Sequence, residues 1–390
     1  MINDFLSWPS FSQEEADAVS RVLLSNQVNY WTGTECRDFE EDFADYTGCN
    51  HAIALANGTV ALDLAFKALG IGEGDEVVVT SRTFIASVSS IVLAGATPVF
   101  ADVDRDSQNI NASTVKQVLT PRTKAIVAVH LAGLPCEMDG LMQLAEQHQL
   151  FVIEDCAQAH GAKYKNRPVG SIGHIGAWSF CQDKIMTTGG EGGMVTTNDY
   201  ELWNKMWSYK DHGKSFDAVY NEQHPPGFRW LHHSFGTNWR MTEMQAVIGR
   251  LQLKKMPSWT KARQGFAEQI DNVCKKISAL RVPSFSNEFE HAKYKHYVFI
   301  RPEYLKKDWS RDRIIEEITQ LGVPCFQGSC SEVYLEKAFE GTSFRPAERL
   351  KVARELAETS LMFLVHPTLT QEEKQKTCAV ILEIMEKASI

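Results

Sequence analysis

The chain has no excess of positive charge and no long apolar run. Its 390 residues include 40 Lys and Arg against 49 Asp and Glu, which gives a formal net charge of -9. Nucleic-acid-binding proteins are usually basic on at least one face, so this balance argues against such a partner. No apolar run approaches the length of a membrane span, and the start lacks a basic segment followed by an apolar one. We therefore expect a cytoplasmic protein with no membrane partner.

The sequence also lacks C-x-x-C pairs and the glycine-rich motif of dinucleotide-binding enzymes. Nine cysteines, an odd number, form no C-x-x-C pair, which is typical of free thiols in a reducing compartment. The pattern closest to a metal motif is the pair Cys156 and His160. A zinc site needs a second pair of ligands, which the sequence lacks, so we expect no metal. A nicotinamide-dependent enzyme would need a glycine fingerprint between its first strand and helix, and none is present.

Alternating strand and helix patterns from about residue 50 to 210 predict a largely parallel sheet with helices on both faces. We expect strands at 52–56, 76–80, 97–101, 124–129, 150–154, 177–181 and 193–197. A helix from Thr242 should end near Lys255, before Pro257. Beyond it, the pattern predicts a helix through the 260s and 270s, a strand at 296–301, a helix at 311–321 and a last helix after Thr370. We therefore expect a large domain, 1–255, and a small α+β domain, 256–390.

Lys184 is the residue most indicative of chemistry. It follows an apolar strand pattern and precedes the glycine-rich turn Gly189-Gly-Glu-Gly-Gly193, whereas an ordinary lysine is a solvated surface charge. We expect it in a cleft. A desolvated amine can lose its proton and attack a carbonyl, which is how lysine forms a Schiff base with pyridoxal phosphate.

Asp155 ends the apolar strand pattern Leu150-Phe-Val-Ile-Glu-Asp155. Ligands bind at the carboxyl ends of strands in open α/β sheets. A carboxylate there can pair with a protonated pyridine nitrogen and keep the ring an electron sink. Taken alone, Asp155 is better explained as the N-cap of a helix, but together with Lys184 the cofactor role is favoured.

The turn Asn57-Gly58-Thr59 leads a strand into a helix that runs to about Leu69. Free amides at that helix start, with the Thr59 hydroxyl, form an anion site for a phosphate. Asn-Gly before a helix is also common in turns that bind no ligand. Ser179 could add a hydroxyl to this phosphate. Phe84 follows the strand at 76–80 and is either a stacking partner for a flat cofactor or a core phenylalanine.

Further segments complete a recognisable pattern: Gly33-Thr-Glu-Cys-Arg-Asp-Phe-Glu40, His130-Leu-Ala-Gly-Leu-Pro135, Glu154-Asp-Cys-Ala-Gln-Ala-His-Gly161, Gly236-Thr-Asn-Trp-Arg-Met241 and His366-Pro367. With the Ser179 to Met194 run, they make the chain resemble the DegT/DnrJ/EryC1/StrS family of sugar-nucleotide aminotransferases over almost its whole length. The resemblance implies a fold type I α/β enzyme, with a mostly parallel seven-stranded sheet between helices and a smaller C-terminal α+β domain.

The resemblance also implies residue roles. Lys184 would form the Schiff base with pyridoxal phosphate, which passes through pyridoxamine phosphate during turnover. The residues implied to bind the cofactor are Gly58, Thr59, Phe84, Asp155, Gln158, Ser179 and, from the neighbouring subunit of a homodimer, Asn238. His160 either touches the cofactor or packs behind it. Residues expected to contact the substrate are Tyr30, Trp31, Arg229, His232, Arg240 and Phe326.

The implied reaction moves an amino group from glutamate to a nucleotide-linked keto sugar. A dehydratase subgroup of this superfamily has histidine in place of the lysine, so Lys184 favours transamination. The run 185–193 is similar to members that aminate C4 of 4-keto-6-deoxy sugars, including 2-acetamido sugars, in surface-polysaccharide (lipopolysaccharide O-antigen) or deoxysugar synthesis. Amination of C3 is the alternative, and a non-catalytic pyridoxal-phosphate-binding regulator or scaffold is an alternative of another class.

Overall fold

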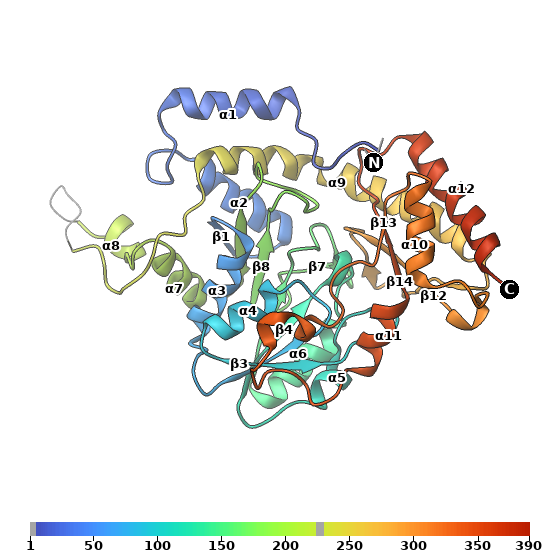
Figure 1. Cartoon of the computed structure of the whole chain (residues 1–390). Helices are drawn as coiled ribbons and strands as arrows, with labels where there is room; N and C mark the ends of the chain where they lie inside the picture. Colours follow the sequence, from blue (N-terminus) through green and yellow to red (C-terminus); the bar gives the residue numbers. More distant parts are fainter. Residues whose placement is uncertain (1–4, 224–229) are drawn as a thin grey trace.

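A seven-stranded sheet lies at the centre of the computed structural model, which describes residues 5–223 and 230–390 (Figure 1). The strand order is β1-β9-β8-β5-β4-β2-β3. The strands are β1 (His51–Leu55), β2 (Glu76–Thr80), β3 (Thr97–Ala101), β4 (Thr123–Val129), β5 (Phe151–Asp155), β8 (Ile175–Ser179) and β9 (Gly193–Thr197). Each strand starts and ends within two residues of its predicted bounds.

Most neighbours in this sheet are parallel, and only β9 runs against its two neighbours, β1 and β8. Because β9 is antiparallel to both, β1 points the same way as β8, β5, β4 and β2. Their carboxyl ends therefore meet along one edge of the sheet. The predicted mostly parallel seven-stranded sheet is confirmed, and the edge where its strands end is the expected place for a ligand.

Helices pack on both faces of the sheet and join its strands. Those before residue 223 are α1 (Gln13–Ser25), α2 (Glu35–Thr47), α3 (Gly58–Leu69), α4 (Ala86–Leu93), α5 (Ala112–Lys116), the 3-10 turn η1 (Leu131–Gly133), α6 (Met138–His148), α7 (Tyr200–Lys210) and α8 (Phe216–Tyr220). Figure 1 shows α8 projecting away from the body of the molecule. None of the helices in the described residues combines the length and the apolar character that a membrane span requires.

A second, four-stranded antiparallel sheet forms the C-terminal part, with the order β10-β12-β14-β13. Its strands are β10 (Leu280–Arg281), β12 (His296–Ile300), β13 (Cys325–Phe326) and β14 (Ser360–Phe363). The accompanying helices are α10 (Arg311–Gln320), α11 (Lys351–Thr359), α12 (Gln371–Ala388) and the 3-10 turns η2 (Pro302–Tyr304), η3 (Val333–Leu335) and η4 (Lys337–Phe339). A small third sheet, β11-β6-β7, joins β11 (Phe289–Glu290) to β6 (Lys163–Tyr164) and β7 (Arg167–Pro168).

The prediction of a helix end before Pro257 is wrong. One helix, α9 (Glu243–Cys274), continues through Pro257 for 32 residues. Proline removes the hydrogen bond to the carbonyl four residues earlier and usually breaks a helix. Here α9 packs against α1, α2 and α12, so tertiary contacts along its length hold it together. The predicted domain boundary at 255/256 therefore falls inside this helix.

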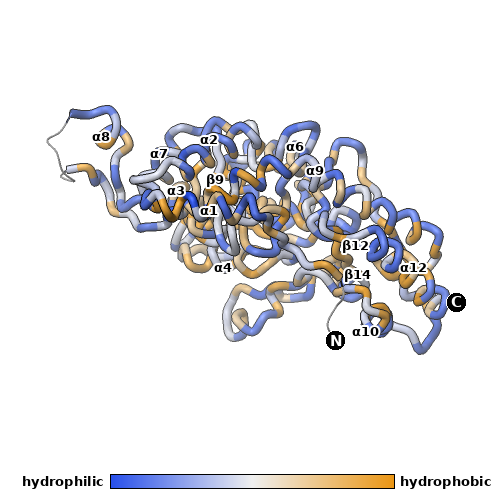
Figure 2. The backbone as a smooth tube through the Cα atoms, turned by 90° about the horizontal axis from the view of Figure 1, so that it is seen from above, coloured by the Kyte–Doolittle hydropathy of each residue, from blue (hydrophilic) through white to orange (hydrophobic). Residues whose placement is uncertain are grey.

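The core follows the strands. All residues of β2, β8, β9 and β12 are buried, as expected for strands covered on both faces. In Figure 2, hydrophobic segments concentrate in the middle of the molecule, near β9.

Candidate active site

A cavity of about 820 Å³ opens at the edge where the parallel strands end. Its walls come from the turns after β1, β2, β5 and β8 of the large sheet and from the C-terminal sheet. Eight of the residues named from the sequence line it: Gly58, Thr59, Phe84, Asp155, Gln158, Ser179, Lys184 and Phe326. The fold thus gathers into one cavity residues that are up to 268 positions apart, from Gly58 to Phe326.

Lys184 is held in this cavity through its backbone. Its N–H donates to the carbonyl of Cys181 at 3.1 Å, and its own carbonyl accepts from the indole nitrogen of Trp8 at 2.7 Å. The Lys184 ammonium lies 5.2 Å from the centroid of the Tyr294 ring. The lysine therefore presents its amine to the cavity from a fixed turn.

Asp155 closes β5 and is 6% exposed. Its Oδ2 accepts a hydrogen bond from the Ser87 hydroxyl at 2.7 Å, and its Oδ1 accepts from the backbone N–H of Ala157 at 3.1 Å. The Ser87 hydroxyl lies 2.7 Å from that of Thr83. These contacts orient the carboxylate at the cavity wall. Within the described residues it forms no ion pair, so its charge is available to a cationic ring nitrogen.

The start of α3 forms a cradle. The side chain of Asn57 accepts from the N–H of Val60 at 3.0 Å and caps the helix, with the amides of Gly58 and Thr59 ahead of it at the open helix end. A Cβ on Gly58 would come within 2.5 Å of Ser179 Cβ. Only glycine allows this approach, which brings helix-start amides beside the Ser179 hydroxyl, a donor set suited to a phosphate.

Phe84 and Gln158 complete the cavity lining. Phe84 is 65% exposed, unusual for a large apolar side chain, and therefore offers an open ring face. Gln158 Oε1 accepts from the N–H of Ala132 at 2.8 Å, which fixes its amide against the wall. Together with the cradle and Asp155, these groups fit a flat, phosphorylated heteroaromatic cofactor.

Several predicted residues do not reach the cavity of their own chain. The Tyr30 hydroxyl donates to Glu40 at 3.1 Å and the Trp31 indole donates to Asp211 at 2.8 Å. Arg240 forms an ion pair with the same Asp211 at 2.8 Å. These three side chains are engaged by acidic side chains and do not line the cavity, so their predicted contact with substrate stays a prediction.

Two further predicted residues, Asn238 and His232, lie elsewhere. Asn238 forms an isolated β-bridge with Asp211, and His232 forms one with Lys214. Neither residue lines the cavity. Arg229 lies outside the described residues.

His160 packs behind the site. Its ring centroid lies 5.2 Å from that of Trp178 and 5.5 Å from that of Phe180, and it is not among the residues that line the cavity. Burial, with Lys184 and Arg263 nearby, lowers the pKa of His160 to about 3. The ring is therefore neutral at physiological pH and belongs to the packing of β8.

Tyr294, Lys295 and Tyr297 line the cavity but were not recognised from the sequence. Tyr294 and Lys295 immediately precede β12, and Tyr297 is its second residue. The rule that ligands bind at the carboxyl ends of strands gives no signal for the start of a strand in another sheet. The only local signal is the density of aromatic and basic residues in Tyr294-Lys-His-Tyr297.

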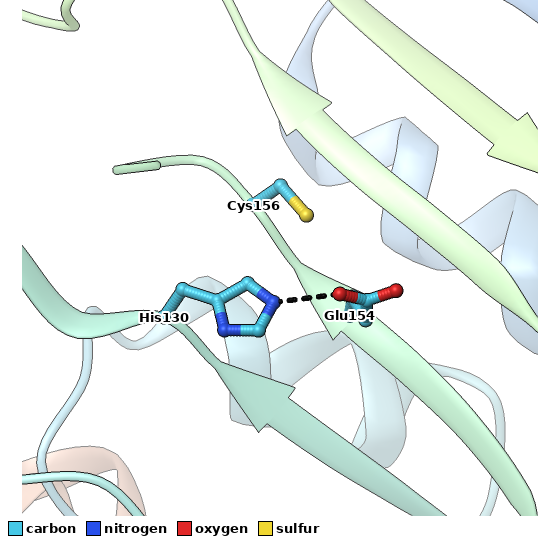
Figure 3. A group of neighbouring side chains, drawn as sticks. All are labelled: His130, Glu154 and Cys156. Atoms are coloured by element: carbon cyan, nitrogen blue, oxygen red, sulfur yellow. Dashed lines mark hydrogen bonds and ion pairs between the residues drawn. The ribbon is translucent and has the colours of Figure 1, made fainter. Parts of the chain in front are cut away.

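His130, Glu154 and Cys156 form a compact buried group beneath the site (Figure 3). His130 Nδ1 accepts from the N–H of Cys136 at 3.0 Å, so Nε2 carries the proton that it donates to Glu154 at 2.9 Å. Glu154 also accepts three backbone N–H groups, from Gly170, Ile172 and Gly173, at 2.8, 2.8 and 2.6 Å. Because the ring nitrogens of His130 and the carboxylate of Glu154 are already engaged in hydrogen bonds, we assign the group a structural role.

Comparison with known proteins assigns the family. The DegT/DnrJ/EryC1/StrS aminotransferase family matches residues 9–382. The chain belongs to this family.

GDP-perosamine synthase of Caulobacter vibrioides is 36% identical over 383 residues, 97% of each chain. The dTDP-3-amino-3,4,6-trideoxy-alpha-D-glucose transaminase of Streptomyces venezuelae is 32% identical over 95% of this chain and 92% of its own. The crystal structure of an aminotransferase from Psychrobacter cryohalolentis superimposes with a TM-score of 0.97 at 64% identity, covering 98% of this chain and 99% of that one.

A structural relative also bears on the cofactor. A putative sugar aminotransferase from Streptococcus pneumoniae, solved in its PMP form, matches with a TM-score of 0.87 and 25% identity, over 97% of this chain and 98% of that one. The protein is a pyridoxal-phosphate-dependent sugar-nucleotide aminotransferase, as the sequence predicted.

Proposed function

We propose that the enzyme transfers the amino group of glutamate to C4 of a nucleotide-linked 4-keto-6-deoxyhexose, with 2-acetamido sugars among the candidates. The observation that carries the proposal is the placement of Lys184, Asp155 and the Gly58–Ser179 cradle in one cavity. The turn after Lys184 supports C4, because the run 185–193 resembles that of C4-aminating members.

Each residue has a proposed task. Gly58, Thr59 and Ser179 hold the phosphate, Phe84 and Gln158 lie against the ring, and Asp155 keeps the ring nitrogen protonated. Bound pyridoxal phosphate supplies an electron sink for the amino-acid α carbon. Lys184 would hold the cofactor at rest and would take up the proton that leaves the α carbon of glutamate. In the second half it would return a proton to the sugar carbon that receives the nitrogen.

Amination of C3 is the second candidate. It is supported by the similarity to the Streptomyces venezuelae transaminase, whose name places an amino group at position 3. The two candidates differ in which carbon lies next to Lys184, and a misplacement of about 1 Å can cost about a hundredfold in rate.

NMR of the product separates these candidates. Purified enzyme is given glutamate and a panel of nucleotide-linked 3-keto and 4-keto sugars, and the nitrogen-bearing carbon is assigned. We expect nitrogen on C4. Nitrogen on C3, with no turnover of any 4-keto sugar, would overturn the C4 assignment and leave the aminotransferase assignment intact.

We also propose a homodimer in which Asn238 reaches the phosphate of the partner's site. Asn238 does not reach the cavity of its own chain, and the segment around it carries exposed aromatic side chains, with Phe235 100% and Trp230 86% exposed. This segment lies next to the projecting α8 (Figure 1), so a second copy of the chain would cover it.

Mixing two inactive variants tests the shared site. Lys184→Ala and Asn238→Ala homodimers should each be impaired, and subunit exchange between them should restore part of the activity because one site per heterodimer is intact. A fully active monomer in sedimentation experiments would exclude shared sites.

For its cellular role we propose cytoplasmic supply of an amino sugar for surface polysaccharide, such as O-antigen, or for deoxysugar synthesis. All nine cysteines are free, in keeping with a reducing compartment. A product that no glycosyltransferase of a surface polysaccharide accepts in a coupled assay would argue against this role.

A further inference from the structure

Lys295 is a second cationic side chain in the cavity, beside Lys184. Its ammonium lies 4.6 Å from the centroid of the Tyr294 ring, and the Lys184 ammonium lies 5.2 Å from the same centroid. Lys295 immediately precedes β12 and lines both the main cavity and an adjoining one of about 240 Å³. Both ammonium groups therefore lie near one aromatic ring, and both lysines line the same cavity.

No carboxylate of residues 5–223 or 230–390 forms an ion pair with Lys295. The nearest candidate, Asp183, already accepts a hydrogen bond from the Tyr294 hydroxyl. Burial lowers the pKa of Lys295 to about 8, Asp183 acts in the opposite direction, and Arg263 and Lys184 add to the lowering. The positive charge is thus incompletely balanced, and an anionic ligand would stabilise it.

Arg263 adds to this imbalance. It is 1% exposed, it lies under the Trp8 ring with its guanidinium carbon 5.0 Å from the centroid, and its Nε and Nη2 form no hydrogen bond within the described residues. It lines the adjoining cavity together with Lys295. A guanidinium keeps its charge even when buried, so this side of the site has surplus positive potential.

We propose that Lys295 binds a carboxylate of the amino donor. This inference rests on the proposed function and adds the residue that recognises glutamate. The amino group of the donor must reach the position that Lys184 serves, so its carboxylates, a few bonds away, lie close to Lys184 and hence to Lys295.

The diphosphate of the sugar nucleotide is the competing anion. It is attached to C1 of the hexose, on the opposite side of the ring from C4. When C4 is at Lys184, the width of a sugar ring therefore separates the diphosphate from the reacting atoms. The position of Lys295 beside Lys184 favours the carboxylate.

Glutarate tests the proposal because it has both carboxylates of glutamate but no amino group to react. Its affinity for the cofactor-loaded enzyme is measured by titration calorimetry. Replacing a charged hydrogen-bond donor with a neutral isostere should weaken binding by about tenfold to a hundredfold, so Lys295→Met should do so. Lys293→Met removes a lysine two residues away that does not line the cavity and should leave the affinity within about twofold of the wild type.

The pH dependence of glutarate binding gives a readout that needs no variant. Wild-type affinity should fall as pH rises above about 8, because Lys295 then loses its proton. Lys295→Arg should restore binding and keep it at higher pH. The other groups that face Lys295 are Lys184, Asp183, Tyr294, Arg263 and His366. Of these, His366 has a pKa lowered to about 3 by burial and stays neutral in this range.

The outcomes separate the two proposals. If the wild type neither binds glutarate nor uses glutamate, the donor in the proposed function is wrong. If the wild type uses glutamate but Lys295→Met binds glutarate normally, only the role of Lys295 is wrong. A loss of affinity for a nucleoside diphosphate, with glutarate binding unchanged, would assign Lys295 to the sugar nucleotide and overturn the proposal.

Discussion

Glu154 and Asp155 are adjacent carboxylates on β5 with opposite surroundings. Glu154 is fully buried and accepts hydrogen bonds from His130 and from three backbone N–H groups of the 170–173 turn. Asp155 faces the cavity and accepts from Ser87 and Ala157. Successive side chains of a strand point to opposite faces. Glu154 therefore supports the fold on one face of β5, and Asp155 faces the cofactor site on the other.

The comparison teaches how to distinguish a supporting polar group from a functional one. On the supporting face, the Glu154 carboxylate and both ring nitrogens of His130 have hydrogen-bond partners in the protein. On the cavity face, the charges of Asp155, Lys184 and Lys295 have no ion-pair partner among the described residues, and the Phe84 ring is uncovered. Variants on the cavity face should therefore change catalysis, and those on the supporting face should change stability.

The largest expected effect is that of Lys184→Ala on the cavity face. Proton transfer by a positioned side chain contributes about 10²- to 10⁴-fold, and turnover should fall at least that far. The melting temperature should stay near that of the wild type. Steady-state assays and thermal unfolding measure both, and normal multiple turnover by this variant would contradict the role of Lys184.

The neighbouring pair tests the comparison most sharply. Asp155→Asn should reduce the chemical step strongly and change the free energy of unfolding little. Glu154→Gln should lower the free energy of unfolding by about 1 to 3 kcal/mol, because a buried acceptor with several charged hydrogen bonds is replaced. Denaturant titration and single-turnover kinetics on both variants would show equal effects if the two faces did not differ.

Acid should destabilise the supporting face through His160. Its pKa is about 3 in the folded protein, against an ordinary value of 6.5, so the unfolded state binds a proton first as pH falls. Folding stability should therefore decrease below pH 6.5, by about 2 kcal/mol at pH 5 from this group.

His160→Phe provides the control. The His160 ring nitrogens form no hydrogen bond in the described part of the chain, so this variant removes the titration without breaking one. Its stability should depend less on pH between 6.5 and 5, and an unchanged pH dependence would show that His160 does not contribute.

Glu154 affects folding stability at lower pH than His160. Burial alone would raise the pKa of Glu154, but hydrogen bonds from His130 and from the amides of Gly173 and Gly170 outweigh burial, and the pKa is lowered overall. A carboxylate with a lowered pKa stabilises the fold above its ordinary value near 4.5 and loses this contribution as pH falls further. The two groups thus act in successive pH ranges, His160 first and Glu154 below it.

The smallest effect is expected for Phe84→Ala. An aromatic pair is worth about 0.5 to 1.5 kcal/mol beyond its buried area, so cofactor affinity should fall about threefold to tenfold or somewhat more. Spectroscopic titration of the apoenzyme with pyridoxal phosphate measures this, and Phe326→Ala, on the C-terminal wall, serves as the comparison. An equal loss in both variants would argue against stacking on Phe84.

Local patterns predicted the large sheet because its strands are short apolar runs bounded by turn residues. They also placed Asp155 and Lys184 at strand ends, where parallel topology brings side chains together. The continuation of α9 through Pro257 was missed because it depends on packing with α1, α2 and α12, which local propensity does not report.

Partners far apart in the sequence explain the other differences. Trp31 and Arg240 have the composition of ligand-binding residues, but Asp211 engages both, at separations of 180 and 29 residues. In contrast, Lys295 looked like an ordinary basic residue before a strand. Its place in the cavity follows from how the C-terminal sheet packs beside Lys184, which a single sequence does not show.

The most direct test of the account is the identity of the lysine that holds the cofactor. Borohydride converts lysine-bound pyridoxal into a stable pyridoxyl-lysine, and mass spectrometry of proteolytic peptides locates it. The account predicts the label on Lys184 alone, with its absorption band lost on adding glutamate and regained on adding a keto sugar. A label on Lys295 or another lysine, or no lysine label in an enzyme that still transaminates, would contradict it.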